Sequence, residues 1–111
     1  MRIIKLILLL WGLVGFVNAQ KVYSEGYMTG RCIKVFVTNY ANNADLLVFK
    51  VKYENQANYN NGKWFFVKYR NRADKRIFFV DYENQADLKV FFVGYENRAG
   101  WRNPYKKYIM F

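Results

Sequence analysis

The acidic side chains of this 111-residue chain recur at regular intervals, which makes them its first candidates for chemistry. They form two sets, Asp45, Asp74 and Asp87, and Glu54, Glu83 and Glu96. A row of carboxylates can hold calcium or supply a general acid and a general base. Asn58 and Gly100 occupy the Asp position in two further copies of the motif, and Arg70 occupies a Glu position. The pattern therefore favours turn hydrogen bonds and solvated charge over a metal or catalytic site.

Other catalytic groups are scarce. The chain has no histidine, which excludes serine-type triads, cysteine–histidine dyads and most zinc sites. Cys32 is the single cysteine, so it has no intramolecular partner, and we expect a buried or inert thiol rather than a cross-link to a second copy. There is no glycine-rich phosphate loop and no nucleophile elbow. The residues predict a non-enzymatic protein without cofactor or metal.

These residues belong to a tandem repeat. Five tyrosines each stand four residues before an alanine, and successive tyrosines are 13, 16, 13 and 13 residues apart. The pairs are Tyr40 and Ala44, Tyr53 and Ala57, Tyr69 and Ala73, Tyr82 and Ala86, and Tyr95 and Ala99. Such periodicity indicates that the recurrent side chains serve the architecture.

Each repeat reads as a short strand followed by a turn. Val90–Tyr95 is rich in β-branched and aromatic residues, and Glu96–Gly100 has the Asn and small residues whose local backbone bonds and flexibility suit turns. Strand side chains alternate between faces, so Phe, Val and Tyr at every second position form one apolar face, which we expect to be the core. Residues 59–61 lengthen the second turn before the turn dipeptide Asn61-Gly62, so we expect a loop there.

The expected fold is an all-β, compact single domain of strand-turn repeats of about 13 residues. A β-solenoid or a small two-sheet barrel would satisfy this periodicity, because stacked units bury one continuous core. No segment of ten or more residues beyond residue 19 keeps a 3.6-residue apolar period, so helices are not expected.

One unit carries a resemblance to a known family. Tyr82–Val93 reads Tyr-x-Asn-Gln-Ala-Asp-Leu-x-Val-Phe-x-Val, and together with Ala99–Asn103 it resembles the septoil-knot family over nearly all of the chain beyond residue 21. The resemblance implies a compact β-rich domain whose backbone ties a seven-crossing torus knot, with no catalytic residues to carry over. The sequence departs from the pattern at Arg31-Cys32, which occupies the Ala-Asp position, and at the insertion 59–61.

The first 19 residues predict a secretory signal peptide. Arg2 and Lys5 precede the apolar run Leu6–Val17, which is too short to cross a bilayer, and cleavage after Ala19 would leave residues 20–111 as a β-repeat domain. Removal of the two basic residues lowers the formal charge from +10 to +8. We expect export to the periplasm or the cell exterior; an uncleaved anchor helix is the alternative.

Basic and aromatic residues alternate near the C-terminus. The candidate surface for an anionic ligand consists of Trp101, Arg102, Tyr105, Lys106 and Lys107. Similar surfaces bind anionic lipid, cell-wall polymer or single-stranded nucleic acid, and export makes nucleic acid the weaker choice. A solvated surface without a ligand is the simpler interpretation.

Three functional hypotheses follow from the sequence. The first is a monomeric, secreted or periplasmic knotted domain that resists unfolding and serves as a stable scaffold or envelope-binding module. The second is a self-assembling extracellular fibre subunit with Asn/Gln-bearing turns, although a charge of +8 opposes stacking. The third is a cationic effector that acts on anionic membranes or the envelope.

Overall fold

The computed structural model describes residues 20–111, so the predicted signal peptide at residues 1–19 lies outside the described residues. The strands are β1 (Lys21–Ser24), β2 (Ile33–Val37), β3 (Leu46–Lys50), β4 (Lys63–Phe66), β5 (Lys75–Phe79), β6 (Leu88–Phe92) and β7 (Gly100–Trp101). Short 3-10 helices follow the strands: η1 (Ala41–Asn43), η2 (Glu54–Gln56), η3 (Arg70–Arg72), η4 (Glu83–Gln85), η5 (Glu96–Arg98) and η6 (Pro104–Met110). The expected alternation of strand and turn is confirmed.

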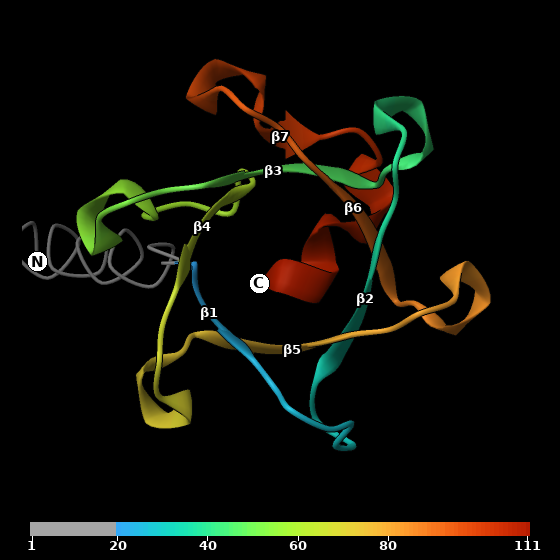
Figure 1. Cartoon of the computed structure of the whole chain (residues 1–111). Helices are drawn as coiled ribbons and strands as arrows, with labels where there is room; N and C mark the ends of the chain where they lie inside the picture. The colour runs from blue at the N-terminus through green and yellow to red at the C-terminus, as the bar shows by residue number, and fades with distance from the viewer. Residues whose placement is uncertain (1–19) are drawn as a thin grey trace, which may run out of the picture.

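Strands β1 to β6 form a closed, parallel barrel (Figure 1). The order around the ring is β1, β5, β2, β6, β3, β4, and β4 pairs with β1 to complete it. The short strand β7 pairs antiparallel with the start of β3, while β4 pairs with the end of β3. The β-rich, compact domain is therefore confirmed. The β-solenoid alternative is wrong, because every pairing between strands of the ring except that of β3 with β4 joins units three or four places apart in the chain. The barrel alternative is closer, but the strands close one ring instead of forming two sheets.

The chain travels around the barrel twice. Strands β1, β2 and β3 make the first lap, and β4, β5 and β6 lie in the gaps of that lap. Every connection advances two positions around the ring except the one from β3 to β4, which advances one. Residues 59–61 lie in that connection, as expected of a loop. The insertion thus marks the place where the first lap gives way to the second.

The core is formed by the face opposite to the one the sequence predicted. Six fully buried residues stand five positions before a tyrosine: Val22, Val35, Val48, Trp64, Ile77 and Val90. Leu46, Leu88 and Met110 complete this cluster. The interior of a small barrel is narrow, and β-branched side chains together with one tryptophan fill it. The phenylalanines of the expected core face are half-buried on the outside instead.

The repeat tyrosines are also outside the core, and their exposed fractions lie between 66% and 71%. Each strand ends three residues before its tyrosine, as β6 does before Tyr95. The tyrosine then precedes a 3-10 helix, and its carbonyl accepts the backbone N–H of the residue three positions on, for example Arg98 at 3.1 Å. The alanine ends that helix, as Ala99 does after η5. Tyrosine and alanine thus define the turn, whereas the buried position defines the core.

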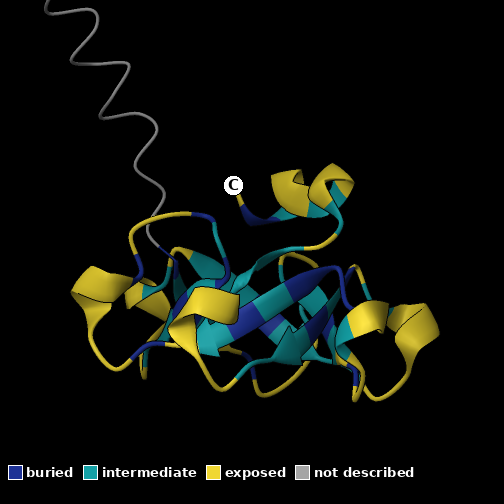
Figure 2. Cartoon of the chain, turned by 90° about the horizontal axis from the view of Figure 1, so that it is seen from above, coloured by how far each residue is buried: buried dark blue, intermediate teal, exposed yellow. Residues whose placement is uncertain are grey.

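Helix η6 covers the end of the barrel at which the strands begin (Figure 2). Met110 is fully buried, and its carbonyl accepts the side-chain amide of Gln20 at 3.1 Å. The side-chain amide of Asn60 donates to the Lys107 carbonyl at 3.0 Å. The sequence did not predict this helix, because seven residues are too few to establish a helical period. Within residues 20–111, no helix is long and apolar enough to span a membrane.

Candidate anion-binding groove

The recurrent aspartates hold strands together. The backbone N–H of a lysine donates to the Asp Oδ2, and the Asp N–H donates to the carbonyl of the same lysine. The pairs are Asp74 with Lys21, Asp87 with Lys34, and Asp45 with Lys89, at 2.7 to 3.0 Å. The carboxylates therefore bond backbone, as expected, but on a neighbouring strand rather than in their own turn. Among the described residues, no group of three or more metal-ligating side chains gathers at one point.

The recurrent glutamates form surface ion pairs. Glu54 contacts Lys21 at 3.1 Å, Glu83 contacts Lys89 at 3.3 Å, and Glu96 contacts Lys63 at 3.1 Å. About half of each glutamate side chain is exposed, so water screens these pairs. The glutamates therefore serve solvation rather than a site. Cys32 is half-buried, and its thiol donates to the Thr29 carbonyl at 2.9 Å.

The five residues predicted as an anionic-ligand surface have divided roles. The indole N–H of Trp101 donates to the Asn60 carbonyl at 3.1 Å, so this ring secures the β3–β4 connection. The Lys106 ammonium lies 3.4 Å from Asp45 Oδ2 and secures η6 to the barrel. Arg102, Tyr105 and Lys107 are exposed. As a ligand surface, this set stays a prediction.

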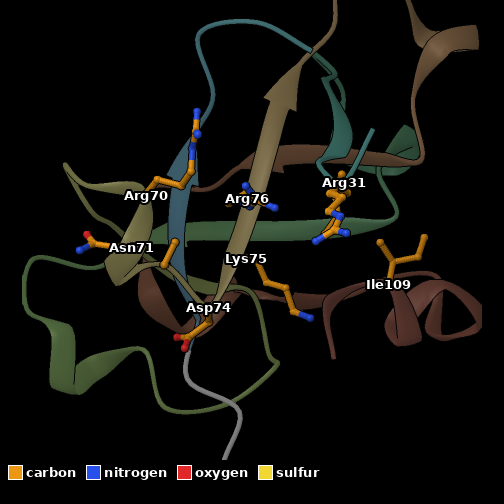
Figure 3. Close-up of a pocket in the computed structure, with 9 residues that line it drawn as sticks. Arg31, Arg70, Asn71, Asp74, Lys75, Arg76 and Ile109 are labelled. Carbon is orange, nitrogen blue, oxygen red and sulfur yellow. The ribbon is translucent and has the colours of Figure 1, made fainter. Parts of the chain in front are cut away.

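A groove of about 660 Å³ lies beside η6 and brings four other cations together (Figure 3). Arg31 comes from the β1–β2 loop, Arg70 from η3, and Lys75 and Arg76 from the start of β5. Ile109 of η6 contributes an apolar wall. We call this site the basic groove.

Glu25 holds one of the four cations by a hydrogen bond and lies near a second. Its side chain is fully buried, and Oε2 accepts Arg70 Nη2 at 2.7 Å while Oε1 lies 3.8 Å from Arg76 Nη1. The hydrogen bond to Glu25, reinforced by the carboxylate charge, raises the pKa of Arg70 above its ordinary value. Each guanidinium has five N–H donors, so one shared carboxylate leaves donors on both for a ligand.

The charge of the basic groove is positive. Four cations face two carboxylates, the lining Asp74 and the anchoring Glu25, which leaves a formal excess of +2. Asp74 Oδ2 is engaged by the backbone N–H of Lys21. Lys75 donates to the carbonyl oxygen of Phe111. The arrangement suits a phosphate, sulfate or carboxylate group, because planar guanidinium forks bind such anions through paired hydrogen bonds.

Sequence reasoning missed the basic groove, although a signal was present. Glu25 and Arg31 lie in the first unit, where the chain departs from its own repeat. The Arg31-Cys32 pair replaces Ala-Asp there, and the arginine lines the groove. A residue that breaks a repeat is freed from the architectural role of that position, so it is a better candidate for a site than a residue that repeats.

The strands close a parallel barrel in two laps, and the 3-10 helix η6 covers one end of it. This arrangement defines a small β-barrel domain. The model of the 7(1) septoil knot domain family matches residues 19–102. The chain therefore belongs to the septoil knot domain family, as its motifs predicted. The match contains every charged residue of the basic groove and ends before η6. No curated protein and no solved structure matches the chain.

Proposed function

We propose that this domain is a non-enzymatic binding module for an anionic polymer of the cell envelope, exported through its signal peptide. The observation that carries the proposal is that Arg31, Arg70, Lys75 and Arg76 line one groove, with the buried Glu25 hydrogen-bonded to Arg70. A guanidinium group that is already held in place, as Arg70 is by Glu25, loses little side-chain freedom on binding, which favours affinity.

A polymer fits this molecule better than a single small anion. The described chain carries a formal charge of +8, and Lys52, Lys68, Arg98 and Arg102 are exposed outside the groove. Such a surface attracts a long polyanion from a distance, while the groove supplies the specific contacts. The groove is also concave, so a flexible chain reaches its floor more easily than a flat bilayer does.

The test compares two double variants in binding long-chain polyphosphate and, separately, alginate at 50 and 300 mM salt. Arg31→Gln with Lys75→Gln removes two groove charges, and Lys52→Gln with Lys68→Gln removes two exposed charges elsewhere. We expect the groove variant to lose about tenfold in affinity at either salt concentration and the control about twofold. Equal losses in the two variants would show that diffuse charge alone holds the polymer and would overturn the proposal.

The proposal includes a knotted backbone that unfolds slowly. Its support is the winding of the chain in two interleaved laps and its membership of the septoil knot family. A threaded chain must unthread as well as lose contacts, so its stability is kinetic. We expect purified residues 20–111 to run as a monomer in light scattering and to survive a broad-specificity protease. Rapid fragmentation of the folded protein would contradict this part.

The two other hypotheses have less support in the geometry. A fibre subunit needs a free strand edge for stacking, but each of β1 to β6 is paired on both sides. A membrane effector would bind anionic vesicles in preference to soluble polymer. The binding assay therefore includes vesicles of phosphatidylglycerol. Stronger binding to these vesicles than to polyphosphate would indicate that the ligand is a lipid surface and not a polymer.

A further inference from the structure

Tyrosine and phenylalanine occupy different parts of this molecule. Nine of the ten tyrosines are exposed by more than 60%, whereas Phe111 at the chain end is the one described phenylalanine with comparable exposure. The barrel interior contains no tyrosine. A tyrosine ring combines an apolar face with a polar tip, so it is well suited to a surface that meets a partner. This distribution indicates that the exposed tyrosine rings have a role outside the core.

Six of the exposed tyrosines occupy the same place in successive turns. They are Tyr27, Tyr40, Tyr53, Tyr69, Tyr82 and Tyr95, with exposed fractions between 66% and 71%. We call this set the tyrosine crown. The five that precede a 3-10 helix share one backbone conformation, with φ between −132° and −123° and ψ between 124° and 141°. Their turns project around the perimeter of the barrel (Figure 1), so these tyrosines belong to separate points around it.

In five of these turns an asparagine stands two residues after the tyrosine. The five are Asn42, Asn55, Asn71, Asn84 and Asn97; all are exposed, and their side-chain amides make no hydrogen bond within residues 20–111. The expectation that turn asparagines bond nearby backbone is wrong for this set. It holds elsewhere, since the Asn58 side chain donates to the Asn55 carbonyl and the Asn103 side chain accepts from the Tyr105 N–H. The asparagines that serve the fold are thus distinct from those that follow the crown.

The residue between tyrosine and asparagine varies in charge. It is Ala41, Glu54, Arg70, Glu83 or Glu96 in the five turns. A charged ligand would be attracted by one of these turns and repelled by another. The chemistry common to all five is uncharged: an exposed aromatic ring and, two residues later in the chain, an exposed amide without a partner among the described residues.

We propose that each Tyr-x-Asn turn binds one sugar of a neutral, β-linked glycan, and that the turns act together on a repetitive chain. The flat C–H face of a pyranose packs on the exposed aromatic ring, and the amide can both donate to and accept from sugar hydroxyls. A single open site of this kind is weak. Repeated sites on a rigid barrel raise the overall affinity for a repetitive ligand, because later contacts form at a high effective concentration.

The tyrosine crown and the basic groove overlap at one turn, η3, where Arg70 and Asn71 line the groove; the other crown turns lie outside it. The glycan proposal does not depend on anion binding. A polysaccharide with acidic substituents would engage both sites, whereas a neutral glycan would engage the crown alone. Measuring neutral glycans at 0.5 M salt therefore isolates the crown.

The experiment uses the folded domain and three neutral probes: a soluble β-1,4-glucan, a β-1,3-glucan and a hexamer of β-1,4-linked N-acetylglucosamine. The crown variant combines Tyr53→Ala, Tyr82→Ala and Tyr95→Ala. The matched control removes three exposed tyrosines outside the crown, Tyr59→Ala, Tyr105→Ala and Tyr108→Ala. We expect the crown variant to lose about tenfold in affinity for at least one probe and the control less than about twofold.

Further arms address the amides, the fold and the groove. A variant with Asn55→Ala, Asn84→Ala and Asn97→Ala should lose about fivefold while its thermal midpoint stays at the wild-type value. The Arg31→Gln, Lys75→Gln variant should bind the neutral probes like the wild type, which separates this proposal from the groove. The proposal fails if the wild type binds none of the three probes, or if the control loses as much as the crown variant. It also fails if the crown variant instead abolishes self-association of the protein, since the occupant would then be a second copy.

Discussion

The barrel wall and the helix-covered end of this molecule are built in opposite ways. In the wall, one buried position, one turn and one Asp–Lys backbone pair recur from unit to unit. The covered end depends on residues that occur once, among them Gln20, Asn60 and Met110. The recurrent positions specify the barrel wall, whereas residues that occur once close one end of the barrel and line the basic groove. Substitutions at singular positions should therefore cost more than the same substitutions at their repeated equivalents.

The largest contrast is expected inside the barrel. Trp64 occupies the buried position that is Val or Ile in the other units, and its ring meets Phe66 edge-on with 6.0 Å between centroids. Trp64→Ala should lower the free energy of unfolding by about 3 to 5 kcal/mol because of the large cavity left behind. Val90→Ala, its repeated equivalent, should cost about 2 kcal/mol. Guanidinium denaturation and unfolding rates measure both, and equal losses would contradict the distinction.

The connection between the two laps gives the next contrast. Gly62 has a φ of +87°, and a Cβ there would collide with the carbonyl oxygen of Leu47. Gly62→Ala should cost about 2 to 3 kcal/mol, since strain and collision add. Gly94 has open space around it, so Gly94→Ala should stay within about 0.5 kcal/mol of the wild type. The shift of the denaturation midpoint measures both losses of stability. An unchanged midpoint for Gly62→Ala would mean that the backbone between β3 and β4 is free to adopt another conformation.

A smaller difference is expected between two aspartates that bond the backbone of a neighbouring strand in the same way. Asp45 is buried and also contacts Asn103 at 3.3 Å and Lys106 at 3.4 Å, whereas Asp87 is exposed and bonds the Lys34 backbone. Asp45→Ala should cost about 2 to 3 kcal/mol because it leaves a covered N–H without a partner. Asp87→Ala should cost about 1 kcal/mol, since water replaces the carboxylate. Hydrogen exchange at the Lys89 and Lys34 amides measures each loss locally; similar exchange in the two variants would remove the distinction.

The smallest effect is expected from pH. A cation whose pKa is raised on folding stabilises the folded state below its unfolded pKa and loses that contribution only as pH rises through the folded pKa. For Arg70 that range lies far above neutrality, and the chain has no histidine. Binding of polyphosphate should therefore change by less than about twofold between pH 6 and 9. A change of several-fold in a binding titration would show that another group controls the groove.

The sequence predicted the wall better than the end. The strand content, the loop at residues 59–61 and the family are confirmed by the structure and the family match. The buried face was predicted wrongly, because Val48 and Phe49 are both apolar and alternation alone does not say which neighbour points inward. The groove was missed because Glu25 and Arg31, in the first unit, are far along the chain from Arg70, Lys75 and Arg76.

The amino-acid sequence by itself determined the local structure of this protein. Strand propensity, the small alanine and the turn asparagines act over a few residues, so a 13-residue repeat can be recognised from the sequence without knowledge of the fold. Only the tertiary structure decided which face is inside, since closing six parallel strands into one ring turns the positions of Val22, Trp64 and their equivalents inward. The repeat tyrosines lie beyond the strand ends, in the turns. Ring closure also joined positions 45 residues apart, Glu25 and Arg70, into one site. Such contacts depend on the path of the whole chain, and no local pattern contains that path.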